Sequence, residues 1–261
     1  MNILVLLRMV PDVVEELEIA PDGRTLDTEY LRMIVNESDD HALEQALILK
    51  ERKGGKVTVL ALDAPDVDDV LFSAVAKGAD RVMKIEGGDG GVTTRAAAGM
   101  FAEIIRNEKD LQPFDIVLTG VQAIDDLDAL VAPILSHRLG LPYLAIVTKV
   151  TPDATGKSVT AIREFAGGVR GEFDVPLPAV LGIQAAEKPP RYVPVAKVRA
   201  AMKTSKIESI GVPTMADGGQ PLLDVSHMRK PVVSGHAQML DGEPEDVSKK
   251  LAGIFTERGL L

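Results

Sequence analysis

Three carboxylates follow a short apolar run, and their spacing admits more than one kind of chemistry. The run is DIVLTG at 115–120, and Asp125, Asp126 and Asp128 come after it. Paired carboxylates can act as a general acid and a general base. Aspartates at the start of a helix also satisfy its free N–H groups, and this capping role is favoured on the residues alone. The order of strand, glycine and helix is also typical of a phosphate site, although the first helical turn has no Ser, Thr or Lys to hold a phosphate.

Two further polar stretches allow a ligand role or a structural one. NESDDHALEQ at 36–45 offers Ser38 or Asp39 as the cap of a following helix. EGGDGGVTTR at 86–95 is similar to a phosphate loop, but it lacks the lysine that such a loop uses. In both stretches the structural explanation is favoured: a helix cap in the first and a flexible connection in the second.

The sequence contains no established catalytic or metal-binding pattern. The motifs G-x-S-x-G, H-E-x-x-H, G-x-G-x-x-G and Walker A are all absent. The chain has no Cys, and its four His residues are not spaced as metal ligands. We therefore expect no catalytic residues and no metal site.

Charge and hydropathy exclude two other classes of protein. A net charge of -10 without a cluster of Lys and Arg argues against nucleic-acid binding. The first apolar run, residues 3–7, is too short for a signal peptide, and no segment approaches the roughly 20 apolar residues of a membrane-spanning helix. We expect a soluble protein of the cytoplasm.

The elements that must position these residues alternate between strands and helices up to about residue 141. This alternation predicts an α/β fold with a doubly wound, mostly parallel sheet. The Asp22-Gly23 pair predicts a hairpin-like turn between the first strand and the first helix. The predicted strands are 2–8, 56–62, 81–86 and 115–120, and the predicted helices are 39–55, 66–78, 93–108 and 129–139.

The pattern changes after residue 142. Four strand-like runs at 143–150, 157–165, 169–175 and 179–184 predict an antiparallel addition to the sheet. A proline-rich stretch at 187–198 is predicted to be extended, and a last helix is expected at 244–259. We therefore divide the chain into a nucleotide-binding domain at 1–186 and a partner-recognition loop with a C-terminal arm at 187–261. Because the arm has little core patterning, we expect it to pack on a partner subunit.

The topology brings three loops to one place. The carboxyl ends of parallel strands meet at one edge of the sheet and frame a ligand crevice. We expect the loops 8–12, 63–66 and 120–128 to converge there. This convergence makes an adenine-nucleotide site as good an explanation as simple packing.

Several ordered motifs resemble the β subunit of electron-transfer flavoprotein. NILVLLRMVPD is similar to the opening strand of that family, and VNESDDHALEQALILKE to its Asn-initiated loop and helix. AKGADRV, GVQAID and PRYVPVAKVRAAMKTSKIE are similar to three later family segments, so the resemblance runs from residue 1 to about 208. The finer likeness is to the form that serves amine dehydrogenases in methylotrophs.

The resemblance implies an αβ heterodimer that carries electrons and is not itself an enzyme. It implies one redox-active FAD held mainly by the α subunit, which receives electrons from a flavin-dependent dehydrogenase and passes them to a downstream acceptor such as a quinone oxidoreductase. The fold would be similar to the adenine-nucleotide α-hydrolases, with AMP in the β subunit, or a second FAD in bifurcating members. By position, the nucleotide would contact Leu6, Asn36, Glu37, Ser38, Asp39, Asp63, Gly120, Val121, Gln122, Ala123, Ile124, Asp125, Asp126, Leu127, Asp128, Ala129, Leu130 and Val131.

The chain departs from the family pattern at two places. The family often has Asn-Gln-Thr where this chain has Ala129, Leu130 and Val131, so side-chain contacts to a phosphate are lost, and Asp126 and Asp128 would repel it. Ala129, Val131 and Pro133 resemble the bifurcating pattern instead. The implied partner-docking segment is Arg191, Tyr192, Val193, Pro194, Val195, Ala196 and Lys197, in which Val195 replaces the usual Leu anchor. Two other classes remain open: a stand-alone nucleotide-binding stress or signalling module, and an enzyme that uses the aspartate cluster.

Overall fold

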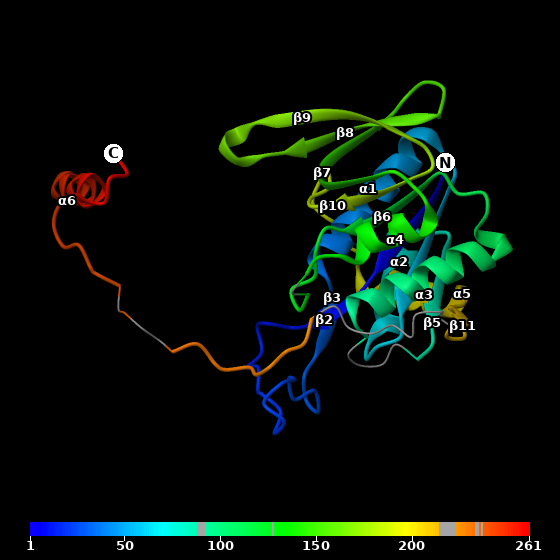
Figure 1. Ribbon diagram of the computed structural model, residues 1–261, viewed down its shortest axis with the longest axis horizontal. Coiled ribbons are helices and arrows are strands. Elements are labelled where there is room, and N and C mark those ends of the chain that lie inside the picture. Colours follow the sequence, from blue (N-terminus) through cyan, green and yellow to red (C-terminus); the bar gives the residue numbers. More distant parts are fainter. Residues whose placement is uncertain (88–91, 127, 214–222, 233–234, 236) are drawn as a thin grey trace. The chain divides into compact units, whose positions relative to one another are not determined.

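A nine-stranded sheet forms the centre of the chain (Figure 1). The computed structural model describes residues 1–261 except 88–91, 127, 214–222, 233–234 and 236, so most of the predicted glycine-rich connection lies outside the described residues. The strand order is β11-β5-β4-β1-β6-β10-β7-β8-β9. In chain order these strands are β1 (Asn2–Leu7), β4 (Lys56–Leu62), β5 (Arg81–Ile85), β6 (Ile116–Gly120), β7 (Tyr143–Pro152), β8 (Ser158–Glu164), β9 (Arg170–Pro176), β10 (Ala179–Ile183) and β11 (Glu208–Ile210).

The central strands β1, β4, β6 and β10 are buried on both faces because helices cover both. Alternate residues of β1 illustrate this: Ile3 and Val5 pack in the core with two helices, and Leu4 and Leu6 pack on the opposite face with two others. The first pair of helices is α1 (Glu37–Lys53) and α2 (Val67–Lys77), and the second is α3 (Thr94–Asn107) and α4 (Val131–Leu139). This arrangement confirms the predicted doubly wound fold.

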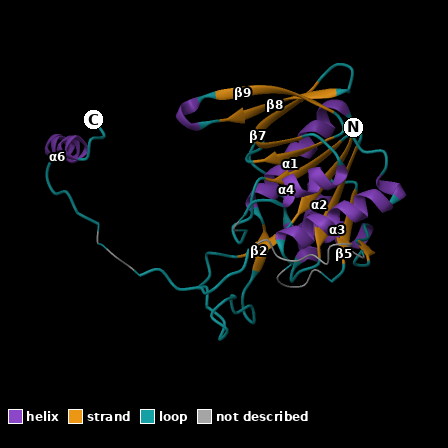
Figure 2. Cartoon of the chain, viewed as in Figure 1, coloured by secondary structure: helices purple, strands orange, loops and turns teal. Residues whose placement is uncertain are grey.

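The second half of the sheet differs from the prediction in one respect. β8 pairs antiparallel with β7 and β9, as predicted, and the three strands form the last part of the sheet (Figure 2). β10, however, lies parallel to both β6 and β7, so an antiparallel addition was wrong for this strand. All five residues of β10 are buried, which is the burial expected for a central parallel strand.

Two short elements near the first loop were not predicted. β2 (Met9–Pro11) and β3 (Met33–Val35) pair antiparallel in a small separate sheet. The predicted hairpin-like turn lies between them: Gly23 has φ +66, and Asp22 accepts hydrogen bonds from the backbone N–H groups of Arg24 and Thr25. Strands of three residues carry too little periodicity to be read from sequence.

Residues 187–198 were predicted to be extended, but a helix begins within them at Val195, and a short strand that was not predicted follows it. α5 (Val195–Thr204) begins directly after Pro194 and packs against α2, and β11 pairs with β5. Proline fixes φ near its helical value and is common at helix starts, so the proline-rich composition marked a helix boundary here. Short 3₁₀ helices occur at Lys109–Leu111 and Ala166–Gly168.

The chain divides into two compact units, Met1–Ser226 and His227–Leu261. The larger unit contains the sheets and the first five helices. The smaller unit contains α6 (Pro244–Glu257), which confirms the predicted last helix. No residue of α6 is buried, and its apolar side chains Leu251 and Phe255 are exposed.

Candidate functional site

The crevice lies where the strand order reverses, between β1 and β6. The chain runs outward from β1 to β4 and β5 and then returns to place β6 on the other side of β1. The carboxyl ends of two such strands diverge into loops on opposite faces, which leaves a crevice between them. Arg8 follows β1 and Val121 follows β6, so these two loops form its walls.

One buried carboxylate joins three parts of the chain at this point. Asp39, at the start of α1, accepts hydrogen bonds from the backbone N–H of Gly120 at 2.7 Å and from that of Arg8 at 2.9 Å. Its side chain is only 2% exposed, and burial raises its pKa despite the nearby Arg8 charge and these hydrogen bonds. A Cβ on Gly120 would lie 2.3 Å from the Asp39 and Ser38 side-chain oxygens. Glycine is therefore required for this close approach.

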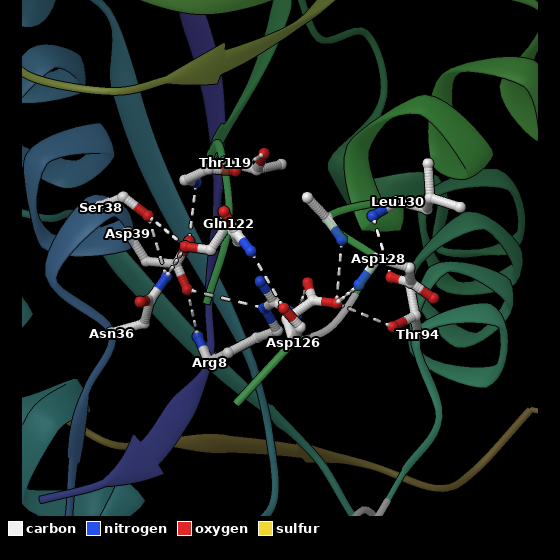
Figure 3. Close-up of polar contacts among 12 residues, drawn as sticks. Arg8, Asn36, Ser38, Asp39, Thr94, Thr119, Gln122, Asp126, Asp128 and Leu130 are labelled. Atoms are coloured by element: carbon white, nitrogen blue, oxygen red, sulfur yellow. Dashed lines mark hydrogen bonds and ion pairs between the residues drawn. The ribbon is translucent and has the colours of Figure 1, made fainter. Parts of the chain in front are cut away.

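The other polar side chains at the start of α1 also bind the β6 loop. The Ser38 hydroxyl donates to the Gln122 carbonyl oxygen at 2.6 Å, and the Asn36 amide donates to the same oxygen at 3.0 Å (Figure 3). The helix N-cap is Asn36, and it makes no side-chain capping bond. The predicted capping role of Ser38 or Asp39 was therefore wrong, because both side chains bond to residues more than 80 positions away.

Arg8 and Asp126 form an ion pair across the crevice. The Arg8 guanidinium lies 3.1 Å from Asp126 Oδ2 and 3.9 Å from Asp39 Oδ2. Asp126 Oδ1 accepts from the Thr94 hydroxyl at 3.2 Å and from the Ala129 backbone N–H at 3.1 Å (Figure 3). Burial acts to raise the pKa of Asp126, but the hydrogen bonds and the Arg8 charge outweigh it, so the pKa lies below its usual value.

The aspartates after β6 do not cap the next helix. α4 begins at Val131, and its N-cap Leu130 makes no side-chain capping bond. Asp126 instead bonds the amides of the preceding loop, and Asp128 bonds the Leu130 amide at 3.2 Å. The predicted capping role was thus wrong, because the helix begins after the three aspartates that were expected in its first turn. Ala129 has φ +54, a conformation that non-glycine residues adopt rarely.

Two hollows adjoin Arg8, and it lines both. The first has a volume of about 240 Å³ and is lined by residues of the loops after β1, β4 and β6, among them Asp63, Asp125 and Asp126. The second has only about 10 Å³ and is lined by Leu6, Arg8, Asp39, Phe101, Thr119, Gly120 and Val131. The three loops that were expected to converge therefore meet around Arg8.

The remaining residues predicted to contact the nucleotide do not lie together around Arg8. A third hollow, a wide groove of about 760 Å³, is lined by Asn36, Glu37, Ser38, Val121, Gln122, Ala123 and Ile124 together with residues of β2 and β3. Leu130 lines a different open hollow beside His137 and Arg138. Asp128 and Ala129 lie in the loop that Asp126 holds, and Leu127 is outside the described residues. Arg8 and Thr94 were not among the predicted site residues. Arg8 was marked only by its place after the first strand, and Thr94 only as part of the stretch 86–95, for which a flexible connection was favoured.

The predicted docking segment is fastened to the middle of α1. Buried Glu44 accepts hydrogen bonds from the Arg191 backbone N–H and from its guanidinium, which also contacts Glu51 at 2.7 Å. Tyr192 is 84% exposed and Val195 is 60% exposed. Val193 is half-buried, and Pro194, Ala196 and Lys197 are exposed. The segment thus presents apolar side chains on a fixed turn, and its last three residues form the first turn of α5.

The fold and its converging loops define an α/β protein with a crevice at the switch point of its sheet, and comparison with known proteins specifies the family. A model of the electron transfer flavoprotein domain matches residues 24–215. The electron transfer flavoprotein subunit beta of Methylophilus methylotrophus is 30% identical over 272 residues, which covers 98% of each chain. The subunit of the same name from Clostridium acetobutylicum is 36% identical over 202 residues, 77% of this chain and 75% of its own. Protein FixA of Azorhizobium caulinodans is 37% identical over 176 residues, 65% of this chain and 61% of its own.

The chain therefore belongs to the electron transfer flavoprotein β-subunit family, which confirms the resemblance seen in the sequence. Within the part of the chain that the structure describes, no helix is long and apolar enough to cross a membrane.

Proposed function

We propose that this chain is the β subunit of a heterodimeric electron-transfer flavoprotein of the cytoplasm. In this role it has no catalytic residues of its own. It pairs with an α subunit that holds most of the FAD, and FAD supplies the redox chemistry when bound. The complex accepts electrons from a flavin-dependent dehydrogenase and passes them to a downstream acceptor such as a quinone oxidoreductase. The similarity over 98% of both chains to a protein named electron transfer flavoprotein subunit beta carries this proposal.

The second part of the proposal is that the crevice binds AMP in a structural role. The groups present fit an adenine nucleotide in kind. Asp63 and Asp125 can accept hydrogen bonds from ribose hydroxyls, and Arg8 is a cation beside them. The first-turn N–H groups of α4 at Val131 and Ala132 have no intrahelical acceptor, and such groups attract anions.

The cavity sets a condition on this binding. Its volume of about 240 Å³ lies below the roughly 300 Å³ at which small-molecule pockets usually begin. A bound nucleotide would therefore either extend beyond this cavity or move a side chain that lines it, and Arg8 lines both this cavity and the smaller hollow.

The third part concerns docking. We assign the contact with a dehydrogenase to Tyr192 and Val195, because they are the large exposed apolar side chains of the docking segment. The backbone of this segment is held by α1, through the hydrogen bond from the Arg191 N–H to Glu44. A fixed apolar side chain can enter a partner pocket with little loss of conformational entropy. The C-terminal arm then serves the α subunit, to which the apolar side of α6 is free to bind.

Nucleotide content tests the proposal directly. The chain is co-expressed with its α subunit, the complex is purified, and the nucleotides released on denaturation are quantified by chromatography. The expected result is one FAD and one AMP per heterodimer. A folded αβ complex that releases no flavin would exclude the electron-carrier role.

A bifurcating variant of the same role is favoured by one feature, the Ala129, Val131 and Pro133 pattern at the crevice. Two FAD per heterodimer would replace the AMP proposal with this one. The stand-alone module makes a different prediction, a soluble homodimer that binds ATP without an α subunit. We expect the chain expressed alone to aggregate, which size-exclusion chromatography measures.

A further inference from the structure

We propose that Arg8 binds the phosphate of the nucleotide and that Asp126 competes with the nucleotide for Arg8. This inference rests on the proposed AMP role of the crevice. It assigns a ligand contact to a residue outside the set that the family resemblance implied. It also makes the Arg8–Asp126 ion pair a determinant of affinity for the ligand.

The charges that line the two hollows carry the first step. Among the described residues that line them, Arg8 is the one cation, and the carboxylates of Asp39, Asp63, Asp125 and Asp126 line the same two hollows. Arg8 pairs with Asp126 and lies near Asp39, whereas Asp63 lies 3.6 Å from the Lys84 ammonium. A phosphate dianion entering this crevice meets net negative charge. Among the described lining residues only Arg8 can offer it a positive charge, so the guanidinium stabilises the phosphate if it turns toward it.

The backbone of Arg8 is held more firmly than its guanidinium, so the guanidinium can turn toward a phosphate. Its backbone N–H is fixed by the buried Asp39 carboxylate at 2.9 Å, so the main chain stays in place. The guanidinium has one hydrogen-bonded ion pair, with Asp126 Oδ2 at 3.1 Å, and its side chain is 16% exposed. The second carboxylate, Asp39, lies farther away at 3.9 Å. Exchanging Asp126 for a phosphate therefore breaks one hydrogen-bonded contact.

The two oxygens of Asp126 have separate tasks. Oδ1 holds the loop, since it accepts from Thr94 and from the backbone N–H groups of Asp128 and Ala129. Oδ2 faces Arg8. An asparagine at 126 can keep Oδ1 as the acceptor for the loop and place its amide opposite the guanidinium. The substitution thus removes the competing charge and leaves the loop bonds available.

The experiment measures AMP binding to the purified αβ complex after nucleotide removal, by isothermal titration calorimetry. We expect Asp126→Asn to bind AMP about tenfold more tightly than the unsubstituted complex, equivalent to about 1.4 kcal/mol. Arg8→Gln is expected to bind it at least tenfold more weakly. Adenosine has no phosphate, so its affinity should differ little among the three complexes.

Thermal unfolding of the nucleotide-free complexes separates this role from a structural one. Asp126→Asn loses an ion pair, so its melting temperature should fall while its affinity for AMP rises. If Asp126 only supported the fold, both quantities would fall together. Asp80→Asn is the matched control: Asp80 also pairs with a cation, Lys50 at 2.7 Å, and accepts from a backbone N–H, that of Val57. This control should be less stable with unchanged AMP affinity.

Three results would overturn the inference. They are an unchanged or weaker AMP affinity in Asp126→Asn, AMP affinity in Arg8→Gln equal to that of the unsubstituted complex, and an equal loss of adenosine and AMP binding in Arg8→Gln. AMP binding by none of the complexes would overturn this inference and the AMP role together. The FAD content of the same samples reports on the electron-carrier role separately.

Discussion

Asp39 accepts hydrogen bonds from the ends of two neighbouring strands while it belongs to a helix. Its carboxylate oxygens receive the Gly120 and Arg8 backbone N–H groups, which would otherwise be unsatisfied at the sheet edge. The stretch around Asp39 was marked as polar by the sequence, but its role could not be deduced. The deciding partner, Gly120, lies 81 positions away, and only the assembled sheet brings the two together.

The close approach at Gly120 gives the first stability prediction. We expect Gly120→Ala to lower the free energy of unfolding by about 1–3 kcal/mol, because the added Cβ would lie 2.8 Å from the Asp39 backbone nitrogen and force a shift of α1. Denaturant titration measures the change. Gly182→Ala is the control, since this buried glycine of β10 would make only ordinary contacts at 3.4 Å and beyond. Equal losses in the two variants would contradict the steric explanation.

The left-handed conformation of Ala129 gives a prediction of opposite sign. Ala129→Gly should raise the free energy of unfolding by up to about 1 kcal/mol, because glycine adopts the observed φ of +54 without strain. Ala132 lies three residues further on, in the first turn of α4. Ala132→Gly should therefore lower the free energy of unfolding by about 1 kcal/mol. Thermal unfolding of the pair provides the check. A loss of stability in both variants would show that Ala129 is not strained.

The buried Glu44 predicts a specific pH dependence of stability. Burial acts to raise its pKa, but the hydrogen bonds from Arg191 outweigh this, and the pKa lies below its ordinary value of 4.5. As the pH falls, the unfolded chain therefore takes up the proton before the folded one. The stabilisation by the Glu44 carboxylate should be complete above about pH 4.5 and be lost as the pH falls through the lowered pKa.

Glu44→Gln tests this directly. In the αβ complex, the difference in unfolding free energy between the unsubstituted protein and Glu44→Gln should be largest near neutral pH and shrink on acidification. Denaturant titrations between pH 7 and pH 3 measure it. A difference that stays constant over this range would show that the charge of Glu44 does not contribute.

At the scale of elements, α1 was predicted well in extent and poorly in contacts. The expected range of 39–55 is close to Glu37–Lys53, because apolar residues at helical spacing and the following glycines mark a helix and its end. The helix also buries Glu44 and Gln45, which bond the segment 187–191. Polar residues on a buried face weaken the periodic signal of a helix. The spacing of apolar residues therefore did not predict that Glu44 and Gln45 bond the segment 187–191.

The pairing of the strands was the second feature that the sequence did not predict. The runs 143–150 and 179–184 were found, yet β10 inserts between β6 and β7 instead of joining a simple antiparallel series. Alternation and run length predict that a strand exists and how it is buried. They do not specify its neighbours, which depend on the path of the whole chain.

The contacts between the docking segment and α1 predict how often the segment opens. Arg191→Lys loses the guanidinium that contacts Glu44 and Glu51 together, so the segment should open more often. We expect the backbone amides of 191–193 to exchange hydrogen about tenfold faster, as measured by mass spectrometry. Arg81→Lys is the control, because that ion pair with Glu208 lies in a different part of the unit. Unchanged exchange in Arg191→Lys would mean that the segment is held by other contacts.

At the scale of the whole molecule, the two units predict separable stabilities. The core clusters and the sheets lie entirely within Met1–Ser226, and α6 has no buried residue. Deleting 227–261 should therefore leave the melting temperature of the larger unit within about 2 °C of the full chain. It should weaken association with the α subunit, which sedimentation measures. A large drop in the melting temperature would show that the arm supports its own chain.

The position of β10 in the sheet also determines how long the edge of β6 stays unpaired during synthesis of the chain. β6 pairs with β1 on one side and with β10 on the other, and about 60 residues separate β6 from β10 in sequence. At about 5–20 residues per second, the ribosome needs about 3–12 s to add them. During that time β6 has one open edge at the centre of the future core, where another strand can pair wrongly. We expect truncated chains that end between 120 and 179 to be bound by chaperones, and those that extend past β10 not to be bound.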